Sequence, residues 1–106
     1  MNDKVKRILS ELRQELERLY GDRLSRLILF GSQARGDAEE WSDIDVLVVL
    51  KGHLERRQEK DKLMDKIVQW NLDYQELVSC VYMTEKRFQN EQSPLLINVR
   101  REGVPI

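Results

Sequence analysis

Two aspartates have the residue type and spacing to hold a metal ion. Asp43 and Asp45 stand at the start of an apolar, β-branched run, Ile44 to Leu50. Side chains alternate across a strand, so residues two apart project from the same face. Two carboxylates placed this way repel each other unless a cation lies between them or solvent screens them. Because no His or Cys is close in sequence, oxygen ligands of this kind favour Mg²⁺ or Mn²⁺ over zinc.

A glycine–serine pair could bind the phosphate on which such a metal would act. Gly31-Ser32 directly follows the apolar run Leu27 to Phe30. Glycine lets the backbone approach a phosphate closely, and free N–H groups at a helix start favour anions. An Asp-x-Asp pair alone is more often a turn aspartate with a solvated neighbour. Twelve residues after a phosphate loop, however, Asp43 and Asp45 predict the second half of a phosphoryl-transfer site.

Helices and strands must position these residues. Apolar residues at spacings of three and four predict a first helix, which Asn2 or Asp3 caps and Gly21 terminates. The segment Gly31 to Ser42 is polar and predicts a loop with one short helical turn. The other expected elements are strands at 27–30, 44–50 and 77–83, a charged helix at 53–71 and a short helix from Ser93-Pro94 to Gly103.

This order of elements predicts an α/β (α+β) fold, a small mixed β-sheet packed with helices. The pattern does not determine which strands pair. At 106 residues we expect a single domain, 1–106, without room for a second catalytic or acceptor-binding domain.

Composition narrows the classes of function. The chain is 41% hydrophobic and 35% charged, which favours a compact, soluble domain. Its net charge of −1 offers no positive field, so bulk nucleic-acid binding is not expected. One cysteine, a polar start and the absence of a long apolar run predict a cytoplasmic protein with no membrane span.

The combined motif resembles a known family. Gly31-Ser32-Gln33-Ala34-Arg35-Gly36 followed by Ser42-Asp43-Ile44-Asp45 closely resembles the signature of the polymerase-β-like nucleotidyltransferase superfamily, especially its minimal nucleotidyltransferases (MNT). The leading helix and the tail from Ser93 to Gly103 also look like MNT proteins. The resemblance implies that Gly31 and Ser32 contact the triphosphate of ATP, the substrate, and that Asp43 and Asp45 hold two Mg²⁺ ions. Arg35 occupies a family position in the same loop, where it could reach phosphate or brace the loop.

One position departs from the family pattern. Many active relatives carry a third carboxylate on a later strand, where the present sequence has Ser79. Asp73 or Glu76 could supply it if the strand register differs by a few residues. This departure keeps nucleotide and metal binding as expectations and leaves two functions open, an enzyme and a binding module that neutralises its partner by complex formation.

The resemblance also implies a partner. Small MNT proteins are similar to the antitoxins of HEPN–MNT toxin–antitoxin systems, which transfer AMP from ATP to a tyrosine of the HEPN ribonuclease toxin. A short chain without an acceptor domain must take its acceptor from a partner, and its length disfavours an enclosed small-molecule pocket. An RNA 3′ end as acceptor and a homo-oligomer both stay open.

Five further features have ordinary structural explanations. His53 is expected to be an exposed turn residue, and Cys80 a buried small residue of a strand. Trp41 could stack on a base or form a lid or core contact. The pairs Arg56-Arg57 and Arg100-Arg101 predict solvated helix faces.

Overall fold

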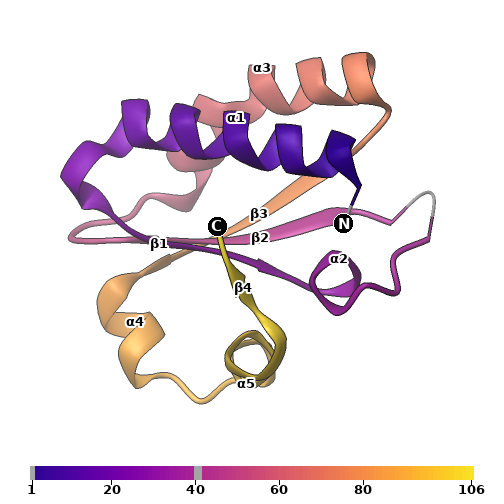
Figure 1. Ribbon diagram of the computed structural model, residues 1–106. Helices are drawn as coiled ribbons and strands as arrows, with labels where there is room; N and C mark the ends of the chain where they lie inside the picture. Colours follow the sequence, from indigo (N-terminus) through magenta and orange to yellow (C-terminus); the bar gives the residue numbers. More distant parts are fainter. Residues whose placement is uncertain (1, 40–41) are drawn as a thin grey trace.

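The structure is a computed structural model that describes residues 2–39 and 42–106. A mixed sheet of four strands, in the order β3-β2-β1-β4, forms its centre. Helices α1 and α3 cover one face of this sheet, and α4 and α5 lie on the other (Figure 1). The fold class predicted from the sequence is confirmed. The strands are β1 (Leu24–Phe30), β2 (Ile44–Leu50), β3 (Val78–Thr84) and β4 (Val104–Pro105). The helices are α1 (Asp3–Tyr20), the 3-10 turn η1 (Gly21–Arg23), α2 (Ser32–Arg35), α3 (Arg56–Tyr74), α4 (Glu85–Asn90) and α5 (Pro94–Glu102).

The long helix at the N-terminus forms as predicted. The side chain of Asn2 accepts the backbone N–H of Val5 and so caps α1, and Gly21 ends it at a φ of 51°. The predicted bounds of the charged helix, 53–71, are wrong, because α3 begins at Arg56 and ends at Tyr74. Its periodicity is weak, so the apolar pattern did not define its ends.

Besides the 3-10 turn η1, two short elements were not predicted. Helix α4 begins where the Thr84 side chain accepts the backbone N–H of Arg87, and Phe88 is its only apolar residue. Strand β4 is two residues long and pairs Val104 with Leu29 of β1. Neither segment is long enough to show a period, and tertiary contacts decide both.

Strand pairing brings three strand ends together. Strands β1 and β2 are antiparallel, and Phe30 is the register partner of Asp45. Strands β2 and β3 are parallel, with α3 as their crossover, and Asp45 is the register partner of Ser79. The end of β1 and the starts of β2 and β3 therefore meet at one end of the sheet, as Figure 1 shows at the position of α2.

The sheet separates two apolar layers. In β2, Val46, Val48 and Leu50 face the layer of α1 and α3, and Leu47 and Val49 face the layer of α5. Alternation along the strand then places Asp45 on the α5 side. From α5, Leu96 and Val99 complete the core of that side.

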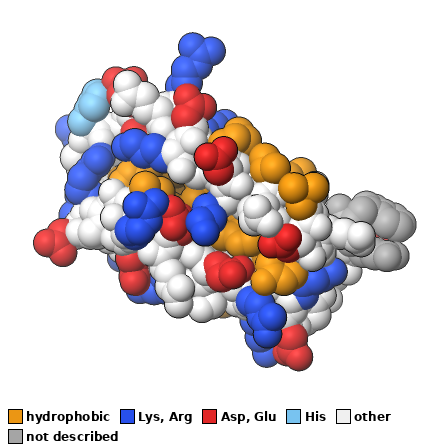
Figure 2. Space-filling model, turned by 90° about the horizontal axis from the view of Figure 1, so that it is seen from above, with side chains coloured by type: hydrophobic (Ala, Val, Ile, Leu, Met, Phe, Trp, Pro, Cys, Tyr) orange, Lys and Arg blue, Asp and Glu red, His pale blue; other side chains and the backbone are white. Residues whose placement is uncertain are grey.

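Helix α3 carries an exposed apolar row. Met64, Val68 and Leu72 recur every four residues and are 48%, 48% and 71% exposed, and Leu77 beyond the helix is 47% exposed. Figure 2 shows the face of α1 and α3 from above, with hydrophobic side chains exposed between charged ones. Among the described residues, no helix has both the length and the apolar character needed to cross a membrane.

Candidate functional site

The loop after β1 is shaped by two glycines. Gly31 has φ 75° and ψ −157°, a region of backbone conformation that essentially only glycine adopts. Its carbonyl oxygen accepts the N–H groups of Ala34 and Arg35, both at 3.1 Å, which closes the single turn of α2. Gly36, at φ 83°, ends this turn and donates its N–H to Ser32 O at 3.0 Å. The predicted helical turn is confirmed, and its first N–H groups lack acceptors within the helix.

The two aspartates lie near each other, as their spacing predicted. Asp45 is the second residue of β2 and is half-buried, and Asp43 is exposed directly before the strand. Burial raises the pKa of the Asp45 carboxyl, and the charge of Asp43 raises it further, whereas the charge of Arg35 lowers it. The ionised form of Asp45 is therefore disfavoured both by burial and by the neighbouring charge of Asp43.

The loop and the aspartates form one site. Phe30, the residue before Gly31, pairs with Asp45 across the two strands. The carboxylate of Asp45 fills the space that a side chain on Gly31 would need. The loop after β1 and the acidic side chain of Asp45 on β2 therefore lie side by side.

The donor set suits a hard cation. Asp43 and Asp45 offer carboxylate oxygens only, and a cation between them would relieve the repulsion that raises the pKa of Asp45. Within residues 2–39 and 42–106, no group of three or more His, Cys, Asp or Glu side chains is placed to hold a metal. Mg²⁺ fits the pair, which has no third carboxylate beside it in this described part of the chain.

The structure does not bring either alternative carboxylate to the pair. Ser79 lies beside Asp45 on the neighbouring strand, on the same face. Glu76 precedes β3 in phase with Val78, which belongs to the opposite layer, and it is buried against Lys4 with 3.5 Å between Oε1 and Nζ. Asp73 is exposed on α3, where it accepts the Gln69 side-chain amide at 2.9 Å. A neutral hydroxyl therefore stands next to Asp45.

Arg35 binds two carboxylates of its own chain. Its Nε donates to Oδ2 of Asp37 at 3.2 Å, and its Nη1 donates to Oε1 of Glu102 at 3.0 Å. These hydrogen bonds raise the pKa of the guanidinium above its ordinary value. Sequence reasoning missed Glu102, because it lies 67 residues away on another element.

Most of the remaining predicted residues have structural roles. His53 is exposed and lies 2.7 Å from Oε1 of Glu55. Burial raises the pKa of the Cys80 thiol to about 12, which makes it a poor nucleophile. Arg56, Arg57 and Arg101 are exposed, as predicted. Trp41 lies outside the described residues.

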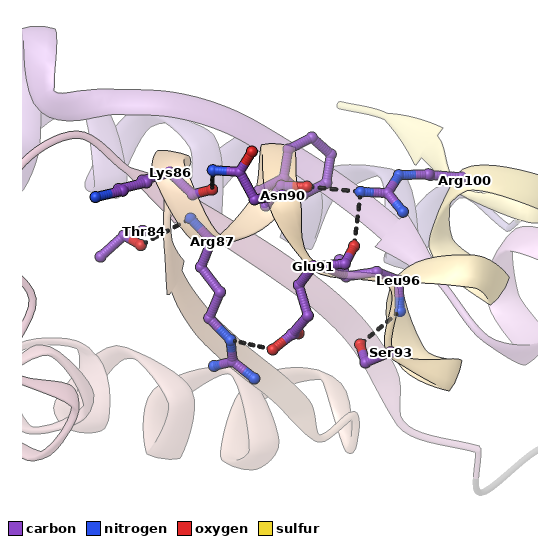
Figure 3. A network of polar contacts seen from close by, with 9 residues as sticks. Thr84, Lys86, Arg87, Asn90, Glu91, Ser93, Leu96 and Arg100 are labelled. Atoms are coloured by element: carbon purple, nitrogen blue, oxygen red, sulfur yellow. Dashed lines mark hydrogen bonds and ion pairs between the residues drawn. The ribbon is translucent and has the colours of Figure 1, made fainter.

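Arg100 is exposed, as predicted, and has a structural role as well. Its Nη2 donates to Phe88 O at 2.7 Å and to Glu91 O at 3.1 Å. Figure 3 shows Arg100 joining α5 to the end of α4 in this way. The side chain therefore satisfies carbonyl groups at the end of α4 that the helix itself leaves unpaired.

The sequence has relatives among known proteins. A protein of Methanocaldococcus jannaschii named as a putative protein adenylyltransferase, MJ0141, is 39% identical over 72 residues, which cover 68% of this chain and 72% of that protein. A second protein of the same organism with the same description, MJ1305, is 46% identical over 61 residues, and the matched segment spans 58% of this chain and 42% of that protein.

Solved structures share the fold. A toxin–antitoxin structure with AMP-PNP gives a TM-score of 0.63 at 20% identity, over 91% of this chain and 69% of that one. A putative nucleotidyltransferase from Sulfolobus solfataricus gives 0.59 at 22% identity, over 96% and 80%. At these identities the likeness establishes the fold alone. The family model for the nucleotidyltransferase domain matches residues 9–104, and this chain therefore belongs to that family.

Proposed function

We propose that this protein transfers AMP from ATP to a protein hydroxyl, a tyrosine of a HEPN ribonuclease toxin, and thereby acts as an antitoxin. One observation carries the proposal: the loop of Gly31-Ser32 lies directly against the carboxylate of Asp45. The description of relatives as protein adenylyltransferases supports a protein acceptor, and the toxin–antitoxin structures of the same fold support a toxin as that acceptor.

Each part of the site has a role in this reaction. The free N–H groups at the start of α2 and the hydroxyl of Ser32 would bind the triphosphate, so that its α-phosphorus faces the carboxylate pair. Asp43 and Asp45 would hold two Mg²⁺ ions. When bound, these ions would stabilise the attacking and leaving oxygens. The acceptor oxygen forms a bond to the α-phosphorus, the bond to pyrophosphate breaks, and the acceptor proton passes to solvent.

The neutral Ser79 favours a phenolic acceptor. Its hydroxyl, next to Asp45, cannot serve as an anionic ligand or as a base. An aliphatic hydroxyl depends on such help, whereas tyrosine ionises near pKa 10 and needs less of it. A tyrosine therefore suits a site with two carboxylates.

The surface near the site suits a protein acceptor. Leu77, at the near end of the exposed apolar row, lies two residues before Ser79. Exposed apolar surface of this kind marks protein interaction sites, whereas a small molecule needs a more enclosed pocket. We propose that the row Met64, Val68, Leu72 and Leu77 contacts the acceptor protein.

Ser79 also motivates the second candidate function, a binding module that neutralises its partner by complex formation alone. Both candidates retain the partner, and they differ in whether Asp43 and Asp45 are needed. The double variant Asp43→Asn and Asp45→Asn, in an intact complex, separates them.

The test uses the HEPN protein encoded beside this chain, mixed with it, ATP and Mg²⁺. We expect the intact mass of the partner to rise by multiples of an AMP group, and a Tyr→Phe change at the modified residue to abolish the increase. The double Asn variant should form the complex without modifying the partner. An unmodified partner with the native chain would overturn the enzymatic proposal, and full neutralisation by the double Asn variant would favour the binding module.

A further inference from the structure

We propose that Arg35 and Glu102 form a brace that holds the phosphate loop in place, and that Arg35 is a positioning residue that never contacts phosphate. This inference rests on the proposed binding of ATP at Gly31-Ser32. The two side chains come from elements that are far apart in sequence, and the ion pair at 3.0 Å joins the last residue of α2 to the last residue of α5.

Helix α2 needs an external support. It has four residues. A single turn is not stable by itself, because ordering its backbone costs more free energy than its few hydrogen bonds supply. Within residues 32–35, no side chain is fully buried against the core. The guanidinium of Arg35, held by Asp37 inside the loop and by Glu102 outside it, supplies such a support.

Glu102 is a fixed anchor at the C-terminal end of α5. The next residue, Gly103, packs so closely that a β-carbon there would lie 2.6 Å from Cγ2 of Ile28. Its N–H donates to Val99 O at 2.8 Å, and Val104 then pairs with Leu29 in β1. This pairing therefore holds Glu102 in a fixed place relative to the end of β1, directly before Gly31.

The other end of α5 is also fixed. The Ser93 side chain accepts the backbone N–H of Leu96 and caps the helix (Figure 3). From the last turn of α5, Arg100 also binds carbonyl groups of Phe88 and Glu91 and so ties the helix to α4. A helix held at both ends can transmit its position to α2 through one side chain. Glu102 acts on the site by this route.

The local charges argue against phosphate as the partner of Arg35. One guanidinium already lies between the two carboxylates of Asp37 and Glu102. A triphosphate that took the guanidinium would leave both carboxylates unpaired beside its own negative charge, which like-charge repulsion disfavours. The brace therefore persists when nucleotide binds.

A charge swap tests the brace. In an Asp37→Asn background, we would measure the affinity for ATP with Mg²⁺ by calorimetry for Arg35→Glu, for Glu102→Arg and for both together. Each single change should weaken ATP binding about three- to tenfold, the size of coupling between contacting residues, and the double change should restore most of it. A phosphate-binding Arg35 could not be rescued, because the carboxylate introduced by Arg35→Glu would repel phosphate.

Two further variants complete the test. Glu102→Gln should weaken ATP binding, while Arg101→Gln, an exposed change one residue earlier, should not. A folded swap variant that binds ATP as weakly as Arg35→Glu alone, or a Glu102→Gln variant with native affinity, would overturn the brace. The calorimetry contains no acceptor, so its result does not depend on AMP transfer. A native chain that binds ATP here but leaves the partner's mass unchanged in the transfer assay would overturn the proposed function alone. A native chain that binds no ATP would overturn both.

Discussion

A β-carbon on Gly31 would lie 2.6 Å from Oδ2 of Asp45, closer than real β-carbons approach any heavy atom. The phosphate loop and the acidic strand therefore touch at a position where only glycine fits. The backbone reinforces this requirement, because φ 75° with ψ −157° is a conformation that side chains disfavour. Position 31 is thus where the two halves of the site constrain each other.

Gly31→Ala should damage both stability and the site. The backbone strain costs about 1–3 kcal/mol, and the methyl group must displace the Asp45 carboxylate. We expect a lower melting temperature and a loss of ATP and Mg²⁺ binding of on the order of tenfold or more, the equivalent of about 1.4 kcal/mol. Gly21→Ala is the control, because Gly21 has φ 51° with no atom within 4 Å of the added carbon. It should lower stability alone; equal losses of ATP binding in both variants would contradict the contact.

Asp45→Asn should stabilise the protein at neutral pH. The pKa of Asp45 is raised by burial and by Asp43, so the folded chain binds a proton more tightly than the unfolded chain. Stability from this proton is present at low pH and is lost as pH rises from the ordinary aspartate pKa through the folded one. The neutral amide avoids that loss, and the gain should be small, ~1–3 °C in melting temperature, because the group is partly solvated. Thermal unfolding of both proteins at pH 7 and at pH 3 measures this difference in melting temperature. A gain that is larger at pH 3 than at pH 7 would contradict the prediction.

Stabilisation by Mg²⁺ should depend on pH. Carboxylate ligands must be deprotonated, and the raised pKa of Asp45 moves its loss of charge to a higher pH than that of an ordinary aspartate. The rise in melting temperature that Mg²⁺ produces at pH 7 should therefore shrink on acidification, before an ordinary aspartate would protonate. The Asp45→Asn variant should show almost no rise in melting temperature with Mg²⁺, at pH 7 or at acidic pH. Removal of Mg²⁺ by a chelator should reverse the rise in the native protein.

Ser79→Asp should increase AMP transfer. Ser79 is the register partner of Asp45, on the same face, so the new carboxylate would join the pair and give the metal ions a third acidic ligand. We expect the transfer rate to rise by on the order of tenfold, or about 1.4 kcal/mol, while repulsion lowers the stability without Mg²⁺. Ser79→Asn adds similar bulk without charge and should leave the rate at or below native. A rate that does not rise in a folded Ser79→Asp protein would show that two carboxylates suffice.

The combined changes Val68→Glu and Leu72→Glu should impair modification of the partner. Both side chains are exposed, so the fold should tolerate the substitutions, whereas an apolar contact with the acceptor would be lost. The expected result is at least tenfold slower AMP transfer, or about 1.4 kcal/mol, with unchanged ATP binding. Ile97→Glu, at 45% exposure on α5 on the other face of the sheet, is the matched control. Transfer that slows equally in both proteins would argue against the α3 row as the acceptor surface.

Local patterns in the sequence were sufficient for the parts of the molecule that depend on neighbouring residues. The apolar period defined α1, and the β-branched run from Ile44 to Leu50 defined β2 to the residue. Gly31 and Gly36 indicated the loop with its short helical turn, and the period of two in a strand predicted that Asp43 and Asp45 lie near each other. Each of these features follows from propensity, sterics or alternation within a few residues, and no distant contact is needed to specify them.

Tertiary structure decided everything that depends on which strands pair and in which register. Only the parallel pairing of β2 with β3 places Ser79 beside Asp45 and sends Glu76 to the opposite face. Only the closure of the C-terminal segment on β1 brings Glu102 to Arg35. A one-residue change of register reverses every side chain of a strand, and contacts between distant segments have no period to read. The sequence thus determined the site's chemical groups, and the packing of the sheet determined their neighbours.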